Sequence, residues 1–174
     1  YVQREGVDIG RMLEDTAHRA GRHDLVNMGY MEAYITLERK GTGNTAKMWL
    51  VHPGGGSSYA LSYAPQKMIE ALQPGEKPAV AIFGHWHKLE VANIRGVWSI
   101  QAGCTKDLDA FGRKRRLQYH IGGLIVTLKQ DKDGAIYECV PNIRQFWDRD
   151  YYNNQFEGMS GPKKKRAPHG RKKK

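Results

Sequence analysis

The sequence has 174 residues, which suits one domain or a large part of one. Its 28 Lys and Arg against 18 Asp and Glu give a net charge of +10, but eight of the positive charges lie in the last twelve residues. The remaining 20 positive and 18 negative side chains leave the body at +2. A uniformly basic nucleic-acid-binding domain is therefore excluded.

Two other features narrow the class of protein. No apolar run approaches the roughly 18 residues that cross a bilayer, and no signal peptide is visible, so we expect no membrane partner. The two cysteines, Cys104 and Cys139, form neither a disulfide framework nor a CxxC zinc pair. We therefore expect a reducing, cytoplasmic location.

The first half of the sequence alternates helix and strand patterns. Apolar residues at helical spacing predict a helix over 7–20, and strand patterns follow at 33–37 and 48–51. A glycine-rich loop over 53–58 leads to a predicted helix over 64–72 and to a buried strand over 79–83. The order strand, loop, helix, strand predicts a βαβ unit, and hence an α/β fold.

The second half predicts antiparallel strands. The segments 89–94 and 97–102 flank the turn Arg95-Gly96, and the segments 121–128 and 135–140 flank a turn over 131–134. We expect these strands to form an antiparallel meander after the βαβ units. From Gly158 onward Gly, Pro and Lys dominate, so residues 1–157 are the predicted folded part and 158–174 a disordered basic tail.

Three histidines follow predicted buried strands. His52 comes directly after the strand 48–51, and His85 and His87 come after the strand 79–83. If these strands are parallel neighbours, the three imidazoles meet at the carboxyl edge of the sheet, where ligands bind in open α/β folds. On an extended segment the rings of His85 and His87 point different ways, which suits two adjacent metal ions better than one. A structural role for these histidines stays open on spacing alone, and the remaining histidines are read as structural.

Two segments resemble the last two metal-binding motifs of the calcineurin-like metallophosphoesterases: VHPGGG at 51–56 and FGHWH at 83–87. The segments 57–67 and 101–106 are similar to the phage and archaeal branch of that superfamily, and the resemblance covers roughly residues 1–140. It implies a four-layer αββα sandwich and two divalent transition-metal ions (Mn, Fe, Zn or Ni) about 3.5–4 Å apart. It also implies that His52 and His85 bind one ion and His87 the other.

The family's earlier motifs, Asp-x-His, Gly-Asp-x-x-Asp and Gly-Asn-His-Glu/Asp, are absent from the sequence. Because all of them precede the segment 51–56, and because the chain starts at Tyr1 rather than Met, we expect the C-terminal portion of a longer enzyme. That portion should be inactive by itself, and no catalytic residue carries over from the resemblance. A degenerate, inactive homologue is the alternative explanation.

Further residues near these motifs are candidates for substrate binding. Backbone N–H groups of the loop containing Gly54, Gly55 and Ser57 suit a phosphate, although a flexible turn explains the glycines equally well. Tyr59 is a candidate either for stacking on a base or for packing, and Lys88 for contact with phosphate. The basic cluster 113–116, which begins with Arg113, either steers an anionic substrate towards the site or is a solvated loop. Tyr63 and Trp86 either stack on a base or pack in the core.

The leading hypothesis is a metal-dependent phosphoesterase that hydrolyses a phosphomonoester or phosphodiester through a dimetal-activated water. The basic tail and the cluster Arg113–Arg116 favour a phosphodiester or nucleic acid. The alternative hypothesis is a non-catalytic protein that binds nucleic acid through its tail, with structural histidines.

Overall fold

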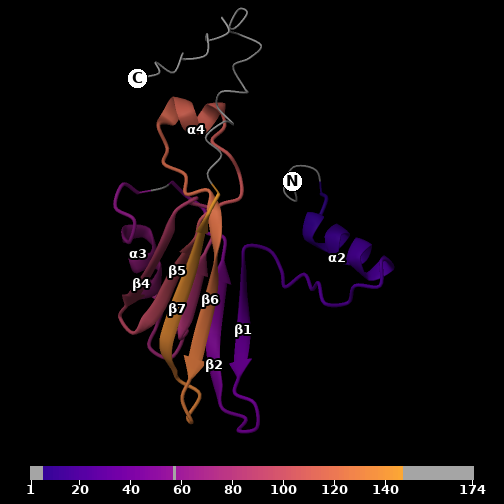
Figure 1. Ribbon diagram of the computed structural model, residues 1–174, viewed down its shortest axis with the longest axis vertical. Helices are drawn as coiled ribbons and strands as arrows, with labels where there is room; N and C mark the ends of the chain where they lie inside the picture. The colour runs from indigo at the N-terminus through magenta and orange to yellow at the C-terminus, as the bar shows by residue number, and fades with distance from the viewer. Residues whose placement is uncertain (1–5, 57, 147–174) are drawn as a thin grey trace, which may run out of the picture.

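The computed structural model describes residues 6–56 and 58–146. Its main element is a five-stranded sheet built from β1 (Glu32–Glu38), β2 (Thr45–Val51), β3 (Val80–Phe83), β4 (Leu89–Ile94) and β5 (Val97–Ala102). The strand order is β1-β2-β3-β5-β4 (Figure 1). The three central strands β2, β3 and β5 are parallel, and the edge strands β1 and β4 are antiparallel to their neighbours.

The predicted βαβ unit is confirmed. Strand β2 leads through α3 (Tyr63–Ala71) into β3, and β2 and β3 pair in parallel with Val51 opposite Phe83. Helix α3 buries Ile69 against the sheet, where it joins a core cluster with Trp49, Ala81 and Phe83. Phe83 is 1 % exposed, and full burial of such a side chain stabilises the fold by about 1.5–3 kcal/mol.

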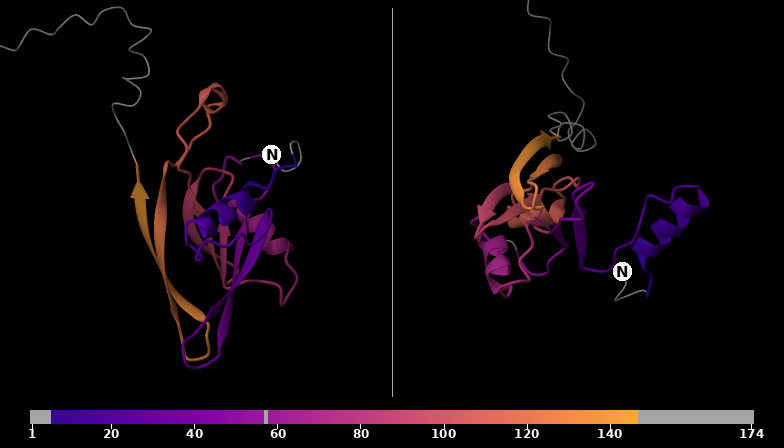
Figure 2. Two further views of the ribbon diagram at one scale, coloured as in Figure 1. Left: turned by 90° about the vertical axis from the view of Figure 1, so that its right-hand side faces the viewer. Right: turned by 90° about the horizontal axis from the view of Figure 1, so that it is seen from below.

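The second half forms two separate hairpins rather than one meander. Strands β4 and β5 pair with each other, and β5 also pairs with β3, so this hairpin completes the first sheet. Strands β6 (Gly122–Gln130) and β7 (Ile136–Gln145) form a two-stranded sheet of their own. Figure 2 shows this second hairpin on the face of the main sheet opposite α3. The described residues thus form a helix layer, a mixed sheet and a hairpin layer.

Helix α2 (Ile9–Arg19) stands apart from the sheets and buries none of its residues (Figure 1). Its start is fixed by Asp8, whose carboxylate accepts a hydrogen bond of 3.1 Å from the backbone N–H of Arg11. None of the helices in the described part of the chain has the length and apolar character that a membrane crossing requires.

Candidate metal and phosphate site

The ends of two parallel strands bring the histidine motifs together. Because β2 and β3 are neighbours in register, His52 and Gly84 leave the sheet side by side, and the Gly84 N–H donates a hydrogen bond of 3.0 Å to the Val51 carbonyl. This is the carboxyl edge of the parallel strands, where α/β sheets bind ligands.

His85 and His87 do not lie on an extended segment, contrary to the sequence analysis. Both residues adopt left-handed backbone conformations, with φ of 71° and 56°, and the Trp86 N–H turns back to the Gly84 carbonyl at 2.8 Å. Side chains other than glycine rarely occupy this region, because Cβ crowds the carbonyl oxygen that follows. The two rings nevertheless part: His85 contacts His52, while His87 packs edge-on against Tyr119 with ring centroids 4.4 Å apart.

The His52 and His85 rings present nitrogen atoms to each other. His85 Nδ1 lies 3.1 Å from His52 Nε2, and the rings meet edge to face at 76°. His85 Nε2 lies 3.0 Å from the carbonyl oxygen of Gly55. Because a carbonyl oxygen only accepts hydrogen bonds, Nε2 of His85 carries the proton that it donates to Gly55. In the neutral form of this ring Nδ1 then has a free lone pair, which faces His52.

This arrangement of nitrogens suits a shared metal ion. Two nitrogens at 2.0–2.1 Å from one ion, at angles between square and tetrahedral, are about 2.8–3.4 Å apart. The observed separation of 3.1 Å falls within that range. Within residues 6–56 and 58–146, however, no group of three or more His, Cys, Asp or Glu side chains is placed to hold a metal ion. The described histidines thus fit one pair of ligands and not a complete centre.

The electrostatic surroundings of His52 and His87 favour the neutral imidazole that metal ligation requires. Burial lowers the pKa of His52, and the nearby His85 lowers it further. Burial also lowers the pKa of His87, and the positive charge of Lys106 acts in the same direction. Neutral rings have their lone pairs available to a cation.

Gly84 is required by a close approach. A Cβ on this residue would lie 3.1 Å from Nδ1 of His52, closer than ordinary van der Waals contact. Gly55 has a different reason for being glycine, since its φ of 84° favours a residue without a side chain. That conformation belongs to the loop that carries the Gly55 carbonyl to His85.

The three histidines line one pocket of 560 Å³, which we call the histidine pocket. Its wall combines the histidines with loop glycines, basic side chains, a carboxylate and aromatic rings: His52, Gly55, Gly56, His85, Trp86, His87, Lys106, Asp109, Phe111, Arg115, Leu117 and Tyr119. Cationic and neutral nitrogen groups thus face the same space, an arrangement that suits an anion next to a metal ion.

The other candidate residues are placed as follows. Gly55 lines the histidine pocket and Gly54 is exposed nearby, whereas Ser57 lies outside the described residues. Tyr59 and Lys88 line a second pocket of 480 Å³, which we call the flanking pocket. Lys88 is 9 % exposed and its ammonium donates to the Ser58 carbonyl.

Of the other aromatic candidates, Trp86 belongs to the core and Tyr63 lies at the surface. Trp86 is 8 % exposed and stacks on Phe83 with centroids 5.8 Å apart. Tyr63, at the start of α3, is 53 % exposed and has the Lys67 ammonium 5.6 Å from its ring centroid. The ring of Tyr59, in contrast to Trp86, is fully exposed.

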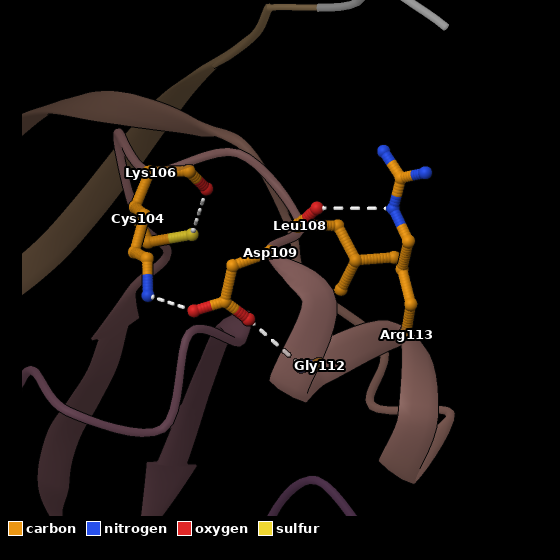
Figure 3. Close-up of polar contacts among 6 residues, drawn as sticks. All are labelled: Cys104, Lys106, Leu108, Asp109, Gly112 and Arg113. Atoms are coloured by element: carbon orange, nitrogen blue, oxygen red, sulfur yellow. Dashed lines mark hydrogen bonds and ion pairs between the residues drawn. The ribbon is translucent and has the colours of Figure 1, made fainter. Parts of the chain in front are cut away.

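Arg113 lies on a helix that the sequence analysis missed. The segment 113–116 suggested a loop, but α4 (Ala110–Arg115) begins directly after Asp109, which caps it by accepting from the Gly112 N–H at 2.7 Å (Figure 3). The Nε of Arg113 donates to the Leu108 carbonyl at 3.2 Å. The capping aspartate is the signal that was available.

Among the polar residues that line the histidine pocket, Lys106, Asp109 and Tyr119 were not predicted, and Arg115 was predicted only as a member of the basic cluster 113–116. Lys106 donates to the Asp109 carboxylate at 2.5 Å, and this ion pair holds the pKa of Asp109 below its usual range. The guanidinium of Arg115 lies 5.5 Å from the centroid of the Phe111 ring. These residues are at least 19 positions beyond His87 in the sequence, so only the fold places them beside it.

The proposed basic tail, 158–174, lies outside the described residues, as do residues 147–157. Its contribution to binding is therefore still a prediction.

No protein-family model matches the chain, and no curated protein matches it. Among solved structures, the chain is similar to a single mutant of Vps29 from Entamoeba histolytica, with 16 % identity and a TM-score of 0.31. The match covers 64 % of this chain and 61 % of that one, so the chain spans less than two thirds of the structure it matches. Inference about function therefore depends on the chain's own side chains.

Proposed function

We propose that this chain carries part of the metal centre of a metal-dependent phosphoesterase, similar to the calcineurin-like metallophosphoesterases. The observation that carries the proposal is the pair of imidazole nitrogens, His52 Nε2 and His85 Nδ1, that face each other at 3.1 Å. They do so at the carboxyl edge of two parallel strands, in a pocket that also contains basic side chains. In the proposal His52 and His85 hold one ion, and His87 a second.

The remaining ligands in this proposal belong to a segment outside the 174 residues. The family's carboxylate motifs are absent from the sequence, and the described residues supply no third ligand to the His52–His85 pair. The fold is compatible with this proposal, because the hairpin β6–β7 forms a second, two-stranded sheet that lies over one face of the first (Figure 2). In the complete αββα sandwich, residues 1–157 are the C-terminal portion and 158–174 a separate basic tail.

The chemistry divides between metal and protein. Divalent ions held by these histidines would supply an activated water and would neutralise charge on the phosphoryl oxygens. The chain's own residues orient a metal ligand and attract the substrate. The Gly55 carbonyl fixes the His85 ring, and Arg115 and Lys106 provide positive charge beside the phosphoryl group. The Lys106 charge is partly offset by Asp109, so Arg115 is the stronger attraction for an anion.

Metal binding by the 174-residue chain tests the proposal directly. Calorimetric titration with Zn²⁺ or Mn²⁺ should show binding that His52→Ala and His85→Ala each weaken at least about tenfold. His23→Ala is the matched control, since His23 is exposed and lies outside the histidine pocket. Equal affinity in all variants would contradict the metal assignment.

Activity is tested in a longer gene product that contains the missing motifs. With Mn²⁺ it should hydrolyse an aryl phosphodiester, and His85→Ala should abolish turnover. Unchanged turnover in His85→Ala would show that the metal assignment is wrong. Efficient hydrolysis by residues 1–174 alone would show that the absent ligands are not needed.

The alternative, a nucleic-acid-binding protein without catalysis, predicts a different pattern. The chain would then bind no divalent metal, and replacing the eight basic residues of the tail by Gln would remove its affinity for nucleic acid.

A further inference from the structure

Two pockets adjoin at the carboxyl edge of the sheet and share a wall. The histidine pocket and the flanking pocket are both lined by Trp86, Leu117 and Tyr119. Their volumes, 560 Å³ and 480 Å³, are similar. The two pockets are thus immediate neighbours, separated by these three side chains.

A basic projection borders both pockets. Residues 105–118, which we call the basic finger, include α4 and stand above the end of the main sheet (Figures 1 and 2). The finger has five basic and two acidic side chains. Hydrogen bonds within it, from Lys106 and from the Gly112 N–H to the Asp109 carboxylate, give it a defined shape (Figure 3).

Successive arginines of the finger serve different pockets. Arg115 is the last residue of α4 and lines the histidine pocket, where its guanidinium lies over the Phe111 ring. Arg116 ends the helix in a left-handed conformation, with φ of 52° and ψ of 39°, and lines the flanking pocket. The change of backbone conformation at the helix end explains how neighbouring residues reach two sites.

The flanking pocket has the chemistry of a nucleotide site. The Tyr59 ring is fully exposed at its rim, so one face is available to a planar ligand. Arg116 supplies positive charge, and the Gln118 amide can donate and accept hydrogen bonds. Exposed aromatic rings combined with basic side chains are typical of surfaces that bind single-stranded nucleic acid, because bases stack and phosphates pair with cations.

We propose that the substrate is a polynucleotide strand that spans both pockets. The scissile phosphate lies in the histidine pocket beside Arg115, an assignment that rests on the proposed function. The neighbouring nucleotide lies in the flanking pocket, with its base on Tyr59 and its phosphate at Arg116. A cation in each of two adjoining pockets, with the exposed Tyr59 ring in the flanking pocket, suits a ligand with repeated phosphates and planar groups, and a phosphorylated side chain of a protein offers only a single phosphate.

Binding of short ligands by the 174-residue chain tests the proposal. Thymidine 5′-monophosphate and the 5′-phosphorylated dinucleotide pTpT are titrated in EDTA, so that the result does not depend on metal. The dinucleotide should bind about tenfold more tightly than the mononucleotide, because one further base stacks. Arg116→Gln and Tyr59→Ala should each remove this difference, whereas Arg115→Gln should weaken both ligands.

The controls separate the flanking pocket from other sources of affinity. Lys129→Gln removes a charge on β6, where Lys129 pairs with Glu138, and should leave both affinities unchanged. A contribution from the basic tail would persist in Arg116→Gln and Tyr59→Ala. Thermal unfolding of each variant checks that the fold is intact.

Three results would overturn the proposal. These are equal affinity for the two ligands, a difference in affinity that persists in Arg116→Gln or in Tyr59→Ala, and a phosphoserine peptide that binds as tightly as pTpT. A separate result would contradict the proposed function: equal metal affinity in the wild type and in His85→Ala. A chain that binds pTpT through Arg116 and Tyr59 but binds no metal would keep the nucleotide subsite and reject the phosphoesterase.

Discussion

Gly84 and His52 approach so closely that a Cβ on Gly84 would lie 3.1 Å from His52 Nδ1. These residues directly follow the ends of neighbouring parallel strands, and the Gly84 N–H is hydrogen-bonded to the carbonyl of Val51, just before His52. The backbone of one motif thus supports the imidazole of the other. This contact gives the first prediction.

Gly84→Ala should weaken metal binding by about 10–100-fold, the effect usual for residues that orient a ligand. The new methyl group pushes the His52 ring by a few tenths of an ångström and changes its nitrogen separation from His85. Calorimetric titration with Zn²⁺ measures the change. Gly54→Ala is the matched control, since a Cβ there meets nothing within 4 Å. An unaltered affinity in Gly84→Ala would mean that the contact does not position His52.

Metal should stabilise the wild-type chain against unfolding. A ligand that binds only the folded state adds about 2.7 kcal/mol at a concentration 100 times its dissociation constant. Thermal unfolding with Zn²⁺, and again after EDTA, should show a reversible rise in Tm. His52→Ala should lose this rise and His23→Ala should keep it. A rise of equal size in His52→Ala would place the metal elsewhere.

Phe83→Ala should destabilise the fold by about 3–5 kcal/mol, because it removes a fully buried ring and leaves a cavity. The ring contacts both Trp49 and Trp86, with centroids 5.8 Å away in each case. Urea denaturation measures the free energy of unfolding. Phe111→Ala, at a residue 59 % exposed, should change it far less. Similar losses in both variants would contradict the position of the core.

The Lys106–Asp109 ion pair should make the order of the basic finger depend on pH. Lys106 lowers the pKa of Asp109, so the pair contributes fully to the stability of the folded finger above the ordinary aspartate pKa of about 3.9. The contribution is lost as pH falls through the lower pKa of the folded state. A carboxyl titration followed by NMR should find that Lys106→Met raises the Asp109 pKa.

Asp109→Asn provides the control for that titration, because asparagine keeps the helix cap but cannot ionise. In the wild type the Gly112 N–H donates a hydrogen bond to the Asp109 carboxylate. In Asp109→Asn the chemical shift of this N–H should not change as the pH falls into the acidic range. An Asp109 pKa that is the same in wild type and Lys106→Met would show that the ion pair does not stabilise the ionised Asp109.

Local patterns were enough to predict most of the elements. The hairpin 89–94 and 97–102 is observed with the predicted bounds, because a two-residue turn with glycine and flanking apolar strands carry their own signal. The parallel pairing of β2 and β3 followed from the strand, helix, strand order. The helices α2 and α3 and the hairpin β6–β7 differ from prediction only at their ends.

The sequence by itself therefore determined most of the elements, though not α4, and the positions of His52, His85 and His87 after strand ends. Tertiary structure alone decided that β5 pairs with β3, that His85 and His87 adopt left-handed conformations, and that Lys106 and Arg115 face the histidines. Periodicity and turn chemistry act over a few residues, and these determine elements. Contacts between residues far apart in sequence depend on how the elements pack, which no short pattern encodes.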